Sequence, residues 1–316
     1  PLAESGSVCC ISGAVSPDGI HWNGLPGPIG IEFSDNHNVG YYDPVLRKYV
    51  LYTRYWSMGP QSPKVPPDIR NSWTSIARRA IGRSETSDFR YFPPSQSILE
   101  PTAEMLPSEA LYTACHTTLP GAPDQHLMFP TVWNASISDT TRIKLASSHD
   151  GRLWEWVPGG DLLETAPFGQ WNGGCIWVMP ELMERPNGDW MMPYRGDNLP
   201  HKYPRGQRKV SAGFAVWPKG RLVALEADDQ GEFAMVPVIA PGRTLRINAL
   251  TLRTGWIKVE TSAPGHAFAD CNPIVGDRLW TPITWKGHAD TGIEPGKRIL
   301  LRFRLYQAKI FGIEFE

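Results

Sequence analysis

Ser148-His-Asp150-Gly151-Arg-Leu-Trp154 is the stretch that decides the fold, because the same phrase occurs three times in the chain. The other two copies are Ser16-Pro-Asp18-Gly19-Ile-His-Trp22 and Thr86-Ser-Asp88-Phe89-Arg-Tyr-Phe92. The copies start about 60 to 70 residues apart, which is too long for a solenoid repeat and is typical of one elaborated propeller blade. Asp bonds its own backbone and Gly accepts a positive φ, so each copy predicts a tight structural turn at the outer corner of a blade.

The overall charge argues against two classes of partner. The chain has 316 residues and a formal net charge of -1, which provides no electrostatic footprint for nucleic acid or for an anionic membrane. It contains no run of 18 apolar residues, and its first residues lack the basic and apolar segments of a signal peptide. We therefore expect neither a nucleic-acid nor a membrane partner.

The composition favours an all-β protein. The 13 Trp, 10 Tyr and 11 Phe are residues that strands prefer, and the 30 Gly and 30 Pro punctuate turns. The five cysteines show no C-x-x-C spacing, so we expect mostly buried free thiols rather than a disulfide framework or a thiolate metal site.

The repeats divide the chain into units of similar design. Each unit is expected to hold a strand, a hairpin, a second strand, a third strand that ends in the Asp turn, and a short outer strand. We place units at 31–100, 120–166 and 170–226, with residues 1–30 as the tail of a preceding unit. Beyond about residue 207 the strands are charged and alternate regularly, which is typical of a β-sandwich. The predicted domains are a β-propeller over 1–208 and a C-terminal β-sandwich over 209–316.

The chain also resembles a known group of proteins. The residues that carry the resemblance are the Asp turns, Asp124-Gln-His-Leu-Met-Phe-Pro130, and Pro180-Glu181 followed by Asn187-Gly-Asp-Trp-Met-Met-Pro-Tyr-Arg195. They resemble bacterial glycoside-hydrolase-like propellers related to the five-bladed families 32, 43, 62 and 68, with an accompanying sandwich. The resemblance implies a five-bladed propeller and action on a poly- or oligosaccharide. Three units and a partial one fall short of five, so we expect the N-terminal blade, which in these families supplies the first catalytic Asp, to be incomplete.

A glycosidase needs two carboxyl groups across the scissile bond, one as acid and one as base or nucleophile. The start of the innermost strand of each blade should point at the central funnel, and this criterion selects Asp35, Asp124 and Glu181 as catalytic candidates. Glu181 lies in an otherwise apolar stretch, where a buried carboxyl group keeps its proton as a general acid requires. The alternatives are a turn residue for Asp35, a strand-start cap for Asp124 and an outward-facing position for Glu181.

Six further residues are candidates for substrate binding. His37 and His126 accompany the first two carboxylates, and Arg195 could pair with a carboxylate or hold substrate hydroxyls. The remaining three are Trp171, Asn172 and His201. For each, a core, ion-pair or solvated-loop role is the alternative.

No metal site is predicted, because His37, His126 and His201 lack the usual ligand spacing. No cofactor is required, and a structural calcium ion in the propeller channel stays an open alternative. The leading hypothesis is a glycoside hydrolase with a carbohydrate substrate, and the rival is a non-catalytic carbohydrate-binding or scaffolding propeller. The sequence leaves the sugar, the linkage and the oligomeric state open, and an extracellular or periplasmic location is favoured.

Overall fold

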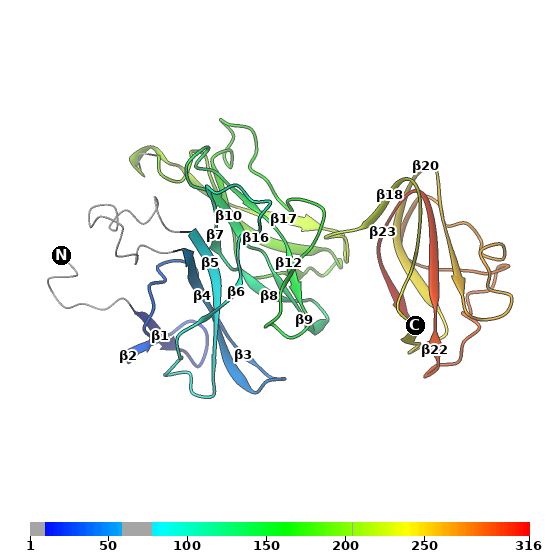
Figure 1. Cartoon of the computed structure of the whole chain (residues 1–316), viewed down its shortest axis with the longest axis horizontal. Coiled ribbons are helices and arrows are strands. Elements are labelled where there is room, and N and C mark those ends of the chain that lie inside the picture. Colours follow the sequence, from blue (N-terminus) through cyan, green and yellow to red (C-terminus); the bar gives the residue numbers. More distant parts are fainter. Residues whose placement is uncertain (1–9, 59–77, 204) are drawn as a thin grey trace. The chain divides into compact units, whose positions relative to one another are not determined.

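The computed structural model describes residues 10–58, 78–203 and 205–316. Over these residues the regular structure is β-strand apart from one 3₁₀ turn, Arg205–Gln207, which agrees with the expected all-β class. The chain divides into two compact units (Figure 1). The first comprises Pro1–Pro186 and Met191–Val216, and the second comprises Asn187–Trp190 and Trp217–Glu316. The predicted boundary between residues 208 and 209 precedes the last strand of the first unit and stays a prediction.

The first complete sheet of this unit, called the first blade below, is an antiparallel meander in the order β3-β4-β5-β6 (Figure 1). Its strands are β3 (Val39–Asp43), β4 (Lys48–Met58), β5 (Arg78–Thr86) and β6 (Gln96–Leu99). Alternating apolar positions on β4 and β5 bury Val50, Tyr52 and Ile81 in one core cluster. The second copy of the Asp turn connects β5 to β6, as the repeat predicts.

The second blade starts earlier than the sequence suggested. It is a bent meander whose strands are β7 (Glu109–Thr113), β8 (His116–Leu119), β9 (Ala122–Met128), β10 (Thr131–Asn134), β11 (Thr141–Ile143), β12 (Ala146–Ser148) and β13 (Glu155–Trp156). The order is β11-β10-β7 in one half and β13-β12-β9-β8 in the other. The bend falls at Cys115, whose φ is positive at 50°, and at Pro130, which has no N–H to donate. The predicted start at residue 120 is therefore wrong, because the consecutive strands β7 and β8 come first.

The third blade consists of β14 (Cys175–Val178), β15 (Met183–Glu184), β16 (Trp190–Asp197) and β17 (Val210–Trp217). Both β14 and β17 pair with β16. Ahead of the first blade, β1 (Ile11–Val15) and β2 (Asn23–Gly30) form a hairpin around the first copy of the Asp turn, which agrees with the expected tail of a preceding unit. The described residues contain no closed sheet, and the five-bladed propeller stays a prediction.

The Asp turns have the predicted local geometry. Asp150 Oδ1 accepts hydrogen bonds from the backbone N–H groups of Arg152 and Leu153, both at 2.8 Å. The Trp154 indole N–H donates to the carbonyl of Gly151 at 3.0 Å, which tucks the ring under the turn. Gly151 has a φ of 66°, the left-handed conformation that glycine adopts without strain. These turns are structural, as expected.

The second unit holds a four-stranded antiparallel sheet in the order β18-β23-β20-β21 and a separate β19–β22 ladder. The strands are β18 (Leu225–Ala234), β19 (Val238–Ile239), β20 (Leu245–Thr261), β21 (Asp277–Pro282), β22 (Arg298–Ile299) and β23 (Leu301–Phe315). Alternating residues of β20 and β23, such as Ile257 and Phe303, are fully or almost fully buried beneath Ile283 and Trp285. The complete β-sandwich stays a prediction.

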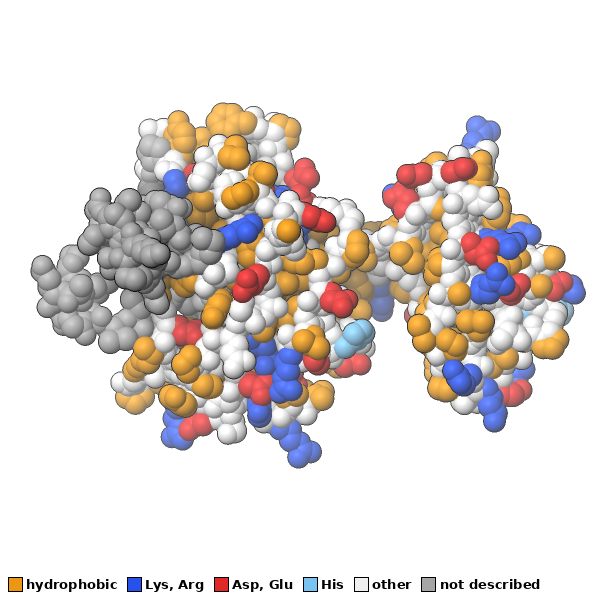
Figure 2. All heavy atoms as spheres, viewed as in Figure 1, with side chains coloured by type: hydrophobic (Ala, Val, Ile, Leu, Met, Phe, Trp, Pro, Cys, Tyr) orange, Lys and Arg blue, Asp and Glu red, His pale blue; other side chains and the backbone are white. Residues whose placement is uncertain are grey.

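The surface carries charges of both signs. On the face drawn in Figure 2, Lys and Arg side chains are interspersed with Asp and Glu rather than gathered into one basic area. None of the residues that the structure places forms an apolar helix of membrane-spanning length.

Candidate functional site

The loop before β3, strand β7 and strand β14 are linked by contacts, and this part of the first unit is called the strand-start end. The loop before β3 reaches β7 because the Asn36 side-chain amide donates to the carbonyl of Tyr112. On β7, the Tyr112 hydroxyl lies 3.2 Å from His201 Nε2. Strand β14 joins them because the Trp177 ring contacts those of Tyr112 and His201, at 4.8 Å and 5.1 Å between ring centres. Three blades therefore contribute to one neighbourhood.

Asp35 lies at this end and is held by an ion pair. The Ser34 hydroxyl accepts a hydrogen bond from the backbone N–H of Arg54 at 2.9 Å, which ties the loop to β4. The Arg54 guanidinium pairs with the Asp35 carboxylate. The Arg54 side chain is almost wholly buried, whereas 67% of the Asp35 side chain is exposed. Asp35 is thus an accessible carboxylate with a fixed cationic partner.

Near Asp35, buried arginines pack against aromatic rings. The Arg54 guanidinium lies 5.2 Å from the Trp56 ring centre, and the Arg79 guanidinium lies 4.2 Å from that of Tyr112. Burial, together with the charge of Arg79, lowers the pKa of Arg54 to about 9. Cation–π contacts of this kind stabilise guanidinium groups that burial removes from water. The aromatic rings here therefore act in packing rather than as an open sugar-binding surface.

His201 belongs to the same cluster. Its ring contacts Tyr112, Trp133 and Trp177 edge to face. Burial, with the nearby charges of Lys202 and other cationic side chains, lowers the pKa of His201 to about 4. The imidazole is thus neutral at pH 7 and can act as a hydrogen-bond partner for the Tyr112 hydroxyl.

Arg195 and His37 also meet at the strand-start end. Partial desolvation and the positive charge of Arg195 lower the pKa of His37, which places the two side chains within electrostatic reach. Arg195 donates a two-pronged pair of hydrogen bonds to Asp197, at 2.8 Å and 3.0 Å. The Trp177 indole N–H donates to the same carboxylate at 3.2 Å, and Asp197 is fully buried. Sequence reasoning missed Asp197, although it follows Arg195-Gly196 directly at the end of an apolar strand.

The Trp171 ring packs closely against two glycines, Gly196 and Gly213. A side chain on Gly213 would come within 2.7 Å of the Trp171 ring, and one on Gly196 would come closer still. The Tyr194 ring stands beside the indole at 5.4 Å between ring centres, and Asn172 donates to the Tyr194 hydroxyl at 3.3 Å. The indole nevertheless keeps 40% of its surface exposed. Trp171 and Asn172 thus form a rigid aromatic surface with a polar edge.

Asp124 and His126 lie elsewhere. They are on β9, the second strand of its blade, and His126 pairs with Ser148 at the start of an Asp turn. His126 is buried and its Nδ1 lies 3.1 Å from Nε2 of His116. The expectation that both face the funnel from an innermost strand is therefore wrong.

The residue that does begin the first strand of that blade is Glu109, which sequence reasoning missed. It is buried and paired with Arg142, whose hydrogen bonds lower its pKa. The negative charge of this carboxylate is therefore already balanced by Arg142 inside the blade. Its spacing of 74 residues from Asp35 could have indicated the position, had β7 been recognised as a strand.

Glu181 is not buried in a strand. Strand β14 ends at Val178, two residues before Pro180, and Glu181 is exposed in the connection to β15. No hydrogen bond or ion pair between residues that the structure describes links Glu181 to the strand-start end. The expectation of a buried general acid here is wrong. Their catalytic roles stay untested predictions.

Among the residues that the structure describes, no three His, Cys, Asp or Glu side chains form a group that could hold a metal ion. The structure thus brings Asp35, His37, Trp171, Asn172, Arg195 and His201 to the strand-start end and leaves Asp124, His126 and Glu181 outside it.

Neither a protein-family model nor a curated protein sequence matches the chain. Among solved structures, an N-acetylgalactosamine deacetylase from F. plautii is 16% identical with a TM-score of 0.43, and the match covers 58% of this chain and 50% of that one. A glycoside hydrolase family 43 arabinoxylan arabinofuranohydrolase from Bacillus subtilis is 10% identical with a TM-score of 0.33, over 95% and 72%. The GH32 β-fructofuranosidase BmSUC1 from Bombyx mori is 9% identical with a TM-score of 0.31, over 95% and 85%.

The match spans about half the length of the first three such structures: 50%, 53% and 52%. Similarity at this level assigns neither a family nor an activity to the chain.

Proposed function

We propose that the first unit binds carbohydrate at the strand-start end, with Trp171 as the ring on which a sugar stacks. The observation that carries the proposal is the exposed indole held flat on Gly196 and Gly213. The C–H face of a pyranose is apolar, so it gains by covering an aromatic ring that water would otherwise contact. A ring that is already fixed by packing against two glycines loses little conformational freedom when a ligand binds.

The surroundings of Trp171 supply the remaining features of a sugar site. Phe168, in the same loop, exposes 74% of its surface and extends the aromatic area. Asn172 and the Tyr194 hydroxyl lie at the edge of the indole and can exchange hydrogen bonds with sugar hydroxyls. The loop itself is held close to β16, because the backbone N–H of Gly174 donates to the carbonyl of Asp197 at 2.9 Å. The ligand class is thus a poly- or oligosaccharide that lies across the surface.

The test is a glycan array followed by titration calorimetry with the best ligand. We expect Trp171→Ala to bind at least about fivefold more weakly, because an aromatic stacking contact contributes about 1–3 kcal/mol. Gly196→Ala keeps the tryptophan but displaces it from its packing against the two glycines, so it should weaken binding as well. Trp22→Ala removes another exposed indole, on the first Asp turn, and is the matched control. Equal affinities for Trp171→Ala and wild type, or no glycan bound by the wild type, would refute the proposal.

A glycosidase is the second candidate function, and Asp35 is the residue that favours it. Its carboxylate is accessible at the start of a first strand, where an acid or base of a propeller site is expected. A hydrolase needs a second carboxyl group nearby, which neither Asp124 nor Glu181 supplies. A hydrolysis screen over aryl glycosides and polysaccharides tests this candidate. Turnover that Asp35→Asn abolishes would support it, and turnover that survives Asp35→Asn would exclude Asp35 from the chemistry.

A further inference from the structure

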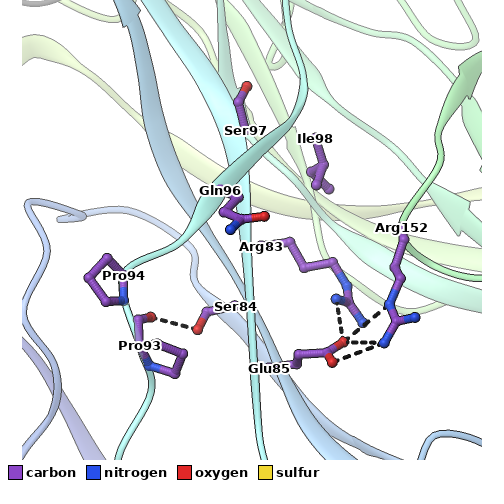
Figure 3. A pocket seen from close by; sticks show the side chains of 9 residues that line it. All are labelled: Arg83, Ser84, Glu85, Pro93, Pro94, Gln96, Ser97, Ile98 and Arg152. Carbon is purple, nitrogen blue, oxygen red and sulfur yellow. Dashed lines mark hydrogen bonds and ion pairs between the residues drawn. The ribbon is translucent and has the colours of Figure 1, made fainter.

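A cleft lies between the first and second blades, and Trp171 is not among the residues that line it. It has a volume of about 490 Å³, within the range of about 300–1,000 Å³ that small-molecule sites occupy. Its walls come from β5, from the segment that leads into and forms β6, and from the third Asp turn (Figure 3). The lining residues are Arg83, Ser84, Glu85, Pro93, Pro94, Gln96, Ser97, Ile98 and Arg152.

One wall of the cleft is a fixed ionic cluster. Glu85 accepts hydrogen bonds from Lys48 at 2.6 Å, from Arg83 at 2.8 Å and from Arg152 at 2.8 Å. Burial alone would raise the pKa of Glu85, but these three donors outweigh it and lower the pKa to about 2. Glu85 is therefore ionised at neutral pH and orients both arginines. The charged residues of the lining are two arginines, Arg83 and Arg152, and one carboxylate, Glu85.

Arg152 is the more accessible of the two arginines. Its Nε and Nη2 are used by Glu85, and Nη1 makes no hydrogen bond with any residue that the structure describes. Of its side chain, 47% is exposed, against 6% for Arg83. Asp150 and Asp43 also act on the Arg152 charge from nearby, although Asp150 is held by backbone N–H groups of its own turn and Asp43 by those of Val45 and Leu46. Arg152 thus presents a guanidinium that is held in place and has donor capacity to spare.

The other walls are of different chemistry. Figure 3 shows Pro93 and Pro94 on the side away from the ionic cluster, with Gln96 between them and Arg83. The proline rings provide an apolar surface, and Gln96 provides a donor and an acceptor at its exposed end. A ligand that fits all three walls has an acidic group, several hydroxyls and an apolar ring face.

We propose that this cleft binds a sugar carboxylate of monosaccharide size, with Arg152 on the carboxylate, Gln96 on ring hydroxyls and Pro93–Pro94 against the ring. Guanidinium groups prefer carboxylates as partners because the charges and hydrogen-bond geometries match. The site is separate from the Trp171 surface and does not depend on it.

The third Asp turn offers a matched control within the repeat. Arg152 stands two residues after Asp150, and Arg90 stands two residues after Asp88. Arg90 is 77% exposed in its side chain and folds back onto Asp88 instead of lining a cleft. Arg152→Gln and Arg90→Gln therefore remove the same charge from equivalent turns, and only the first removes it from the cleft.

The experiment is ligand-observed NMR with glucuronate, glucose and inorganic phosphate on the full chain. We expect wild type, Arg90→Gln and Trp171→Ala to bind glucuronate alike, and Arg152→Gln to bind it at least about fivefold more weakly. Gln96→Ala should weaken glucuronate binding without affecting phosphate. Raising the salt concentration should weaken binding, because an exposed charge contact is screened.

Three results would overturn the proposal: no glucuronate binding by the wild type, equal binding by Arg152→Gln and wild type, or phosphate binding as tight as that of glucuronate. The last result would identify a plain oxyanion site instead of a sugar site. Loss of glucuronate binding in Trp171→Ala would place the ligand at the other surface. Failure at the cleft and failure of the Trp171 proposal are therefore distinguishable.

Discussion

Asp197→Asn should destabilise the first unit, and the contacts of this carboxylate set the size of the effect. Asp197 is fully buried and accepts both prongs of the Arg195 guanidinium and the Trp177 indole N–H. Removing one member of a buried ion pair costs about 3–5 kcal/mol when the remaining charge stays out of water. Arg195 has 37% of its side chain exposed and can turn toward solvent. We therefore expect a smaller loss, of about 2–3 kcal/mol.

Urea unfolding followed by tryptophan fluorescence measures this loss. With a urea dependence of about 2 kcal/mol per M, the midpoint of Asp197→Asn should fall by about 1–1.5 M. Asp124→Asn, at an exposed position, should stay within about 0.5 kcal/mol of wild type. The double variant Asp197→Asn with Arg195→Met should recover part of the loss, because it also removes one of the two cations that pair with Asp197, the other being Arg208 at 3.6 Å. Equal midpoints for Asp197→Asn and Asp124→Asn would refute the reasoning.

Two further predictions concern buried titratable groups. Burial, with the neighbouring His126 and Arg83 charges, lowers the pKa of His116 to about 3, so the unfolded chain takes up a proton below pH 6.5 that the folded chain refuses. Stability should fall by about 2 kcal/mol from this group between pH 7 and pH 5, and urea midpoints of His116→Phe should show a shallower pH dependence than those of wild type. Burial raises the pKa of the Cys115 thiol to about 12, so iodoacetamide at pH 8 should label exposed Cys10 in the native protein and Cys115 only in urea. Peptide mass spectrometry would contradict this if both were labelled at one rate.

The parts of the fold that could be predicted from the sequence are those that local contacts determine. Asp150 bonds N–H groups two and three residues ahead, so its turn is encoded within four residues. The alternating pattern of β4 likewise needs no distant partner to be recognised. By contrast, Glu109 begins a stretch of Glu, Ala and Leu that carries little strand signal, and it becomes a strand because β10 pairs with it. That omission moved Asp124 to the wrong strand of its blade.

The candidate site was predictable in its residues more than in its geometry. Trp171 and Asn172 stand out because they precede Gly173-Gly174, but the glycines on which the indole lies are 25 and 42 residues further along the chain. Glu181 was misplaced for a local reason. Pro180 has no N–H for a strand ladder, and β14 ends before it, so the apolar run does not continue as one strand.

The Asp turn also separates what the repeat specifies from what it leaves free. Its Asp and its hydrogen bonds recur, whereas the residue two positions later depends on the neighbouring blade. Arg90 pairs with Asp88 of its own turn. Arg152 instead pairs with Glu85, which precedes the Asp turn of the neighbouring blade. Because the third turn meets that neighbour, its arginine both ties two blades together and lines the cleft between them. A structural turn in one copy can therefore supply a binding group in another, without any change to the backbone that the repeat encodes.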